Sequence, residues 1–133
     1  TIVTLMYGQQ FQGFSFDKIL LDAPCSGTGT IRKSLKTLLI WNPSMIAKIA
    51  RQQQQLIEAA FRNLRPGGIL VYSTCSLEPE EDEGVVDHLL QKFPEAKVLP
   101  AKLTGLKTSP PVLEFDGKKI EAPPDLREAV PEG

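Results

Sequence analysis

Two apolar runs, each ending in polar residues and a cysteine, dominate the hydrophobic pattern of this chain. Residues 16–23 lead into Cys25, and residues 69–74 lead into Cys75. Short apolar runs rich in Ile, Leu and Val are typical of buried strands in a parallel sheet. We therefore predict two neighbouring core strands whose carboxyl ends carry the polar chemistry.

Between these runs, apolar residues recur every three or four positions, as on one face of a helix. Asn42 and Pro43 form a start signal for this helix, and its apolar stripe is broken only at Gln53. We expect residues 65–68 to end it. A second helix is predicted from the acids at 78–83 onward, since acids stabilise the positive end of a helix dipole.

Strand, helix, strand and helix in alternation predict an α/β fold with parallel strands and crossover helices. Weaker patterns predict short strands over 1–5 and 96–99 and a hairpin over 112–120. Prolines become frequent after residue 100 and periodicity disappears. We therefore divide the chain into a domain over 1–100 and a loosely structured segment over 101–133.

Composition restricts the function classes. The 133 residues contain 15 basic and 16 acidic side chains, so net charge provides no general argument for nucleic-acid binding. No apolar run approaches the roughly 18 residues that span a bilayer, and we expect a soluble, cytoplasmic protein. Two cysteines and a single His88 do not make a zinc site, and no metal is expected. In a reducing compartment, free thiols are more common than a structural disulfide.

The two cysteines are the main candidates for chemistry. If their strands are neighbours, both thiols face one crevice at the edge of the sheet. Polar neighbours such as Asp22 and Ser73 favour this interpretation over buried cysteines that act as small hydrophobic residues. Cys75 precedes a predicted helix start, where a thiolate is stabilised, so it is the candidate nucleophile. Asp22 is either part of the same site or a turn cap.

The segment after Cys25 allows two further interpretations. Residues 26–30 have the glycine and hydroxyl content of a phosphate-binding loop, but they match neither standard phosphate-loop motif. Five cations follow, and they form either a phosphate-facing patch or an ordinary solvated surface. They are Arg32, Lys33, Lys36, Lys48 and Arg51.

Three segments together resemble a known family. Asp22-Ala23-Pro24-Cys25-Ser26-Gly27-Thr28-Gly29, Pro66-Gly67-Gly68 before the second strand, and Ser73-Thr74-Cys75-Ser76 followed by acids are similar to the Sun/Fmu-type RNA cytosine-5 methyltransferases. The resemblance covers about residues 16–99. It implies a partial Rossmann-like sheet. It also implies S-adenosylmethionine as the cofactor of the protein and tRNA or rRNA as its partner.

The resemblance also implies roles for individual residues. Cys75 would add to carbon 6 of cytosine, and Cys25 would assist release of the product. Asp22 would lie beside both the base and the methyl donor, and Pro24 would shape the pocket wall and contact the donor and the RNA. The remaining residues expected to contact RNA are Ser26, Gly27, Arg32 and Lys33.

Two family segments have no counterpart here: the glycine-rich cofactor loop and a C-terminal Gly-Phe-Phe segment. We therefore expect a catalytic half that alone binds S-adenosylmethionine poorly, completed by the rest of its domain or by another chain. Two other interpretations stay open. One is a non-catalytic, RNA-binding or partner-dependent fragment, and the other is a thiol-redox protein that uses Cys25 and Cys75 as a switchable pair.

Overall fold

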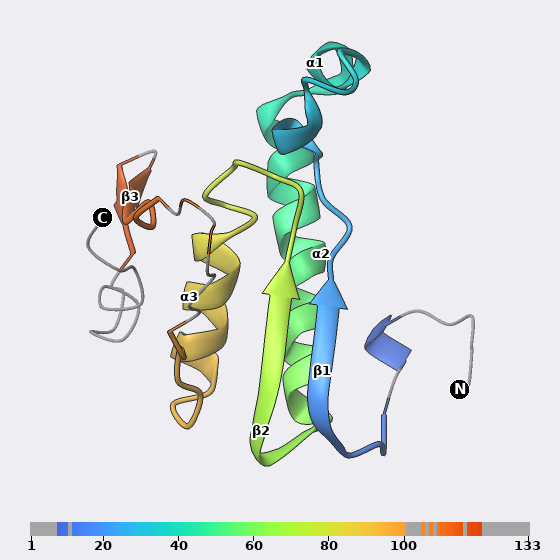
Figure 1. The fold of residues 1–133 in the computed structure, drawn as a ribbon, viewed down its shortest axis with the longest axis vertical. Coiled ribbons are helices and arrows are strands. Elements are labelled where there is room, and N and C mark those ends of the chain that lie inside the picture. The colour runs from blue at the N-terminus through green and yellow to red at the C-terminus, as the bar shows by residue number, and fades with distance from the viewer. Residues whose placement is uncertain are drawn as a thin grey trace.

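The computed structural model describes residues 8–10, 12–100, 105, 107, 109–115 and 117–120. Figure 1 shows the chain order of its elements. The helices are η1 (Gly8–Gln10), η2 (Thr28–Thr30), α1 (Lys36–Ile40), α2 (Pro43–Arg62) and α3 (Glu83–Lys92); the strands are β1 (Phe16–Asp22), β2 (Leu64–Ser73), β3 (Glu114–Phe115) and β4 (Lys118–Lys119).

The two predicted core strands are confirmed as neighbours. β1 and β2 form a parallel pair connected through α2, as expected for an α/β unit. The long helix begins where predicted, because the Asn42 side chain accepts a hydrogen bond from the backbone N–H of Met45 at 2.8 Å. This α/β arrangement is a partial Rossmann-like fold.

β2 begins earlier than predicted. We expected residues 65–68 to end the helix, but α2 ends at Arg62 and Leu64 already pairs with Phe16. The register shifts between Phe16 and Lys18, and this irregularity absorbs the Pro-Gly-Gly segment within the strand. The turn out of α2 is thus shorter than the sequence pattern indicated.

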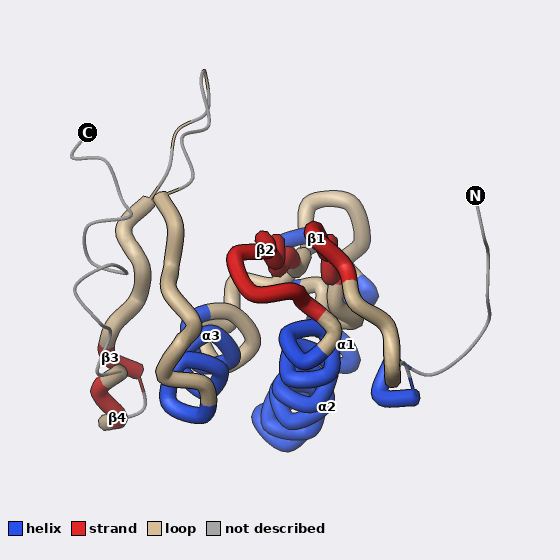
Figure 2. The backbone as a smooth tube through the Cα atoms, turned by 90° about the horizontal axis from the view of Figure 1, so that it is seen from below, coloured by secondary structure: helices blue, strands red, loops and turns tan. Residues whose placement is uncertain are grey.

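Among the described elements, helices cover only one face of this strand pair, as Figure 2 shows. Leu21, Leu70 and Tyr72 pack on that side against a buried cluster centred on Ile57 and Val85. On the other face Leu20 is 71% exposed and Val71 is 51% exposed. The prediction of fully buried strands is therefore wrong for one face of the described structure, because apolar residues at alternate positions point to opposite sides.

The later elements match the predictions only in part. The acids at 78–82 precede α3 instead of forming its first turn. The only acidic residue in that turn is Glu83. Residues 96–99 form no strand. The predicted hairpin is confirmed as the short antiparallel pair β3 and β4, beside which Ile120 packs against Val86 of α3.

The predicted strand over 1–5 lies outside the described residues, as does most of 101–133, so the proposed domain boundary stays a prediction. Within the described ranges, none of the helices combines the length and apolar character needed to cross a membrane.

Candidate active site

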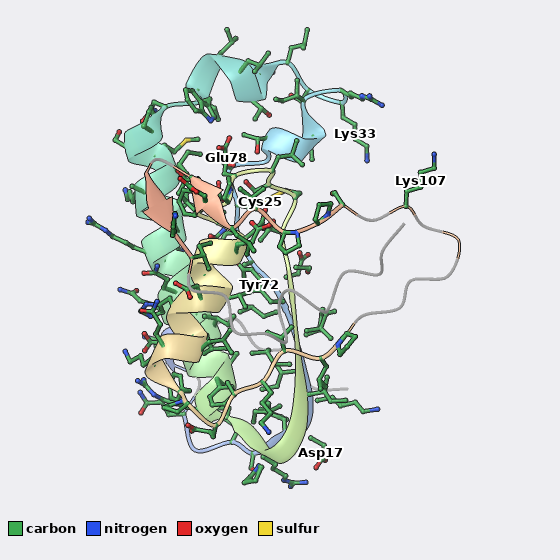
Figure 3. The ribbon with its side chains drawn as sticks, turned by 90° about the vertical axis from the view of Figure 1, so that its left-hand side faces the viewer. Asp17, Cys25, Lys33, Tyr72, Glu78 and Lys107 are labelled. Carbon is green, nitrogen blue, oxygen red and sulfur yellow. A yellow bond between two sulfur atoms is a disulfide. The ribbon has the colours of Figure 1, made fainter. Side chains whose placement is uncertain are left out.

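The carboxyl ends of β1 and β2 bring the two cysteines together. Asp22 pairs with Ser73, and the N–H of Ala23 donates to the Ser73 carbonyl at 2.9 Å, so both strands end at the same level. The Cα atoms of Cys25 and Cys75 are 6.2 Å apart. In Figure 3, Cys25 and Glu78 both lie toward one end of the sheet, and Asp17 lies at the other end. The prediction that the two cysteines lie together at the carboxyl edge of the sheet is confirmed, and the crevice expected there stays a prediction.

The two sulfurs are joined in a disulfide, so the described chain has no free cysteine. The expectation of two free thiols is therefore wrong for this structure. Its physical reason is the alignment of the strand ends, which places the Cα atoms within the usual span of a disulfide. The backbone N–H of Cys75 also donates to the Cys25 sulfur at 3.2 Å.

Asp22 and Pro24 flank this pair from β1. The Asp22 carboxylate is exposed at the strand end, where it accepts a hydrogen bond from the Ser73 hydroxyl at 3.1 Å. Pro24 is exposed on the next turn, and its carbonyl accepts from the Gln53 side chain at 2.9 Å. An exposed carboxylate and an exposed proline ring fit part of a site for a cationic methyl donor.

The glycine loop packs against the backbone of Cys75. The N–H of Gly29 donates to the Cys75 carbonyl at 3.0 Å, and a Cβ atom at position 29 would lie 2.9 Å from that oxygen. Gly27 has a φ of 76°, which glycine adopts without strain. This contact occupies the Gly29 N–H, so it does not support the phosphate-loop interpretation; these glycines allow the two loops to approach closely.

A second contact layer lies beneath the cysteines. The Ser26 and Ser76 hydroxyls are 3.1 Å apart, and the Leu77 N–H donates to the Thr28 hydroxyl at 2.9 Å. Glu81 and Gln53, both fully buried, lie below these residues. Sequence reasoning missed this layer, although Gln53 left a signal by breaking the apolar stripe of α2.

The predicted basic residues occupy two places. Arg32 and Lys33 are exposed between η2 and α1, and Figure 3 shows Lys33 beyond Cys25 at the end of the molecule that contains α1. Lys48 and Arg51 lie on α2, where they line an open cavity of about 410 Å³ that includes neither cysteine. Whether these groups act together on a phosphate backbone stays a prediction.

The helix N-terminus that follows Cys75 is strongly acidic. Thr74 donates to the Asp82 carboxylate at 2.6 Å. Burial is the main cause that raises the pKa of Asp82, and repulsion from Glu83 adds to it, although the bond from Thr74 opposes both. Burial also raises the pKa of the Tyr72 hydroxyl, which donates to the Glu81 carbonyl at 2.6 Å.

Because the pKa of the Asp82 carboxyl is raised, we expect Asp82→Asn to be a stabilising substitution at neutral pH. A raised carboxyl pKa means that ionisation costs the folded state free energy, and this cost is present above the folded pKa and absent below the ordinary value of 3.8. Asparagine keeps an acceptor for Thr74, and no capping bond is lost because the Asp82 side chain makes none to the helix backbone. We expect urea denaturation to show a higher free energy of unfolding for the variant near neutral pH, and this gain should disappear below about pH 4.

Asp17→Asn is the matched control, because Asp17 forms an ion pair with Arg65 at the opposite end of the sheet. It should give no gain at neutral pH. A loss of stability in Asp82→Asn near neutral pH would contradict the assignment.

Paired cysteines at the carboxyl edge of a partial Rossmann-like sheet are what the resemblance to RNA cytosine-5 methyltransferases implied, and comparison with known proteins specifies the family. Residues 3–120 match the model of the 16S rRNA methyltransferase RsmB/F family. The chain therefore belongs to that family, and the resemblance noted from the sequence is confirmed.

Individual relatives agree with this. The chain is 49% identical over 119 residues to a tRNA (cytosine(49)-C(5))-methyltransferase of Pyrococcus abyssi, a match that covers 88% of this chain and 38% of the relative. It is 53% identical over 87 residues to a ribosomal RNA small subunit methyltransferase F of Klebsiella pneumoniae, covering 65% of this chain and 18% of the relative.

A solved structure of a methyltransferase homologue from Pyrococcus horikoshii superposes with a TM-score of 0.63 at 39% identity, covering 86% of this chain and 33% of that one. The chain thus spans a third or less of that structure and of the ribosomal relative, and 38% of the tRNA enzyme.

Proposed function

We propose that the protein containing this chain transfers a methyl group from S-adenosylmethionine to carbon 5 of cytosine in tRNA or rRNA. The observation that supports this most is the juxtaposition of Cys25 and Cys75, with Asp22 exposed beside them. Family membership supports the reaction class. RNA substrates and reduced thiols are both found in the cytoplasm, where we expect the reaction to take place.

Carbon 5 of cytosine is a weak nucleophile, so the base must first be activated. In the proposed reaction the Cys75 thiolate adds to carbon 6, and the electron pair of the carbon 5–carbon 6 bond becomes available at carbon 5. S-adenosylmethionine, when bound, supplies the methyl group from its sulfonium. Cys25 then helps remove the carbon 5 proton, and Cys75 leaves as a thiolate by β-elimination. Both sulfurs must be reduced for these steps, so the disulfide has to open first.

The remaining residues position the reactants. Asp22 and Pro24 would hold the donor and orient the base, Ser26 and Gly27 would line the approach of the nucleotide, and Arg32 and Lys33 would contact phosphates. Attack on carbon 6 requires access to the face of the ring, so the target cytosine has to be unstacked, as in RNA loops.

The direct test is nucleoside analysis of RNA incubated with the full-length protein, S-adenosylmethionine and reductant. We expect 5-methylcytidine as the product. Methylation at another atom, or no methylation together with no heat of S-adenosylmethionine binding in calorimetry, would contradict the proposal; the second result would favour a non-catalytic RNA-binding fragment.

The disulfide itself favours a second candidate, a thiol-redox function. The two cysteines lack the C-x-x-C spacing typical of such proteins, so this candidate is weaker. It requires that the pair open and close with redox conditions. Thiol titration that gives the same count before and after oxidant would exclude it.

A further inference from the structure

A buried carboxylate connects the two cysteine loops. One oxygen of Glu81 accepts hydrogen bonds from the Ser26 N–H and from the Gln53 amide, both at 2.9 Å, and its other oxygen accepts from the Ser76 hydroxyl at 3.1 Å. The Gln53 amide also donates to the Pro24 carbonyl at 2.9 Å. The residues on both sides of Cys25, and the residue after Cys75, are thus attached to the buried pair of Glu81 and Gln53.

The buried pair of Glu81 and Gln53 is not explained by a contribution to folding stability. Glu81 and Gln53 are both 0% exposed, and burying a carboxylate or an amide is costly unless hydrogen bonds compensate. The compensation is incomplete, because the Gln53 side-chain oxygen has no hydrogen-bond partner in the described part of the chain. An apolar residue at position 53 would complete the stripe of α2, so the pair provides something other than packing.

The pair of Glu81 and Gln53 holds three separate segments of the chain at fixed positions relative to one another. These segments are the loop after β1, the loop after β2 and the middle of α2. Glu81 lies 55 positions from Ser26 and 28 positions from Gln53 in the sequence. Without this pair, the described hydrogen bonds between the loops near the sulfurs are those from the N–H groups of Gly29, Leu77 and Cys75 and the contacts of the Ser76 hydroxyl with Ser26 and Thr28. Glu81 contacts neither sulfur in the described structure, so any effect on them has to pass through the backbone of the two loops.

We propose that Glu81, held by Gln53, is a positioning residue that fixes the separation of Cys25 and Cys75. Its catalytic consequence rests on the proposed function, because two thiols that act in successive steps on one base need a fixed spacing. Its effect on the thiol pair itself does not depend on methyl transfer.

The first measurement therefore uses the thiols alone. The full-length protein is equilibrated in buffers of reduced and oxidised glutathione, free thiols are alkylated, and the disulfide fraction is read by mass spectrometry. Glu81→Ala is expected to lower the equilibrium constant for the disulfide about tenfold, because the two thiols lose effective concentration. Glu81→Gln should stay within about twofold, since an amide oxygen can accept the same two bonds and the Ser76 hydroxyl can turn to accept the third.

Gln53→Leu separates positioning from stability. It removes the bonds to Glu81 and to the Pro24 carbonyl but adds apolar surface to the stripe of α2. Because the buried Glu81 carboxylate and the Pro24 carbonyl each lose a donor, we expect lower resistance to urea, as also in Asn63→Ala, but together with a disulfide constant about threefold lower. This variant also keeps the test informative if Glu81→Ala does not fold.

Asn63→Ala is the matched control. Asn63 is also a buried polar residue that connects separate segments, with bonds to Phe14 and Ala59, but it precedes β2 at the end of the sheet opposite the cysteines. Its loss should reduce resistance to urea and leave the disulfide constant unchanged.

The catalytic measurement follows in reductant. For Glu81→Ala we expect kcat to fall about tenfold while the KM for S-adenosylmethionine is unchanged, with rescue by Glu81→Gln. Unchanged disulfide constants in Glu81→Ala and Gln53→Leu, or an equal drop in Asn63→Ala, would overturn the inference. A wild-type protein that makes no 5-methylcytidine would overturn the proposed function and leave the thiol result standing.

Discussion

Replacing Cys75 by alanine in the full-length protein is expected to abolish cytosine methylation, with a loss of at least about a thousandfold in kcat. The reason is that carbon 5 has no other means of activation once the thiolate that adds to carbon 6 is gone. The effect should fall on kcat, because Cys75 is exposed beside the site and does not support the buried cluster. Initial rates of methyl incorporation into RNA measure it.

Two comparisons separate this loss from a structural effect. Wild type and variant are both assayed in reductant, so neither contains the disulfide. Their free energies of unfolding from urea denaturation should agree within about 1 kcal/mol. Cys75→Ser should be as inactive as Cys75→Ala, because a hydroxyl is far less ionised than a thiol near neutral pH. A Cys75→Ala protein that methylates at the wild-type rate would exclude Cys75 as nucleophile.

Replacing Cys25 by alanine should give a different defect. If Cys25 assists the elimination that frees the enzyme, its loss should slow turnover about a hundredfold while the covalent bond to RNA still forms. We therefore expect a protein–RNA complex that survives denaturing electrophoresis, at higher levels than in wild type. The effect distinguishes the two cysteines although they are only 6.2 Å apart at Cα.

The double variant Cys25→Ala/Cys75→Ala is the control for this experiment. It should form no complex stable to denaturant. If the complex persists in the double variant, the bond does not involve Cys75, and the assignment of roles fails.

The centre of the site was predictable from local patterns. Each cysteine follows a short apolar run, and parallel strands that neighbour each other end at one edge, so Cys25 and Cys75 had to meet if the strands paired. The long helix was predictable for a similar reason, because Asn42 and Pro43 act within one turn.

Features that depend on distant partners were not predictable. The buried position of Glu81 depends on Ser26, which is 55 positions away, and no local pattern distinguishes this acid from its half-buried acidic neighbours. The exposed face of β1 was missed because Leu20 is as apolar as Leu21, and only the placement of the helices decides which side is covered. The disulfide was missed because the compartment argument considers chemistry and not distance.

The most direct test of the central claim, that Cys75 is the nucleophile toward cytosine, uses RNA in which the target base is 5-fluorocytosine. Fluorine at carbon 5 cannot leave as a proton does, so the adduct is trapped after methyl transfer in the wild-type protein. Peptide mass spectrometry then identifies the modified residue. We predict the methylated fluorocytidine on Cys75; its attachment to Cys25, or the absence of any adduct from a protein that methylates normal RNA, would contradict the account.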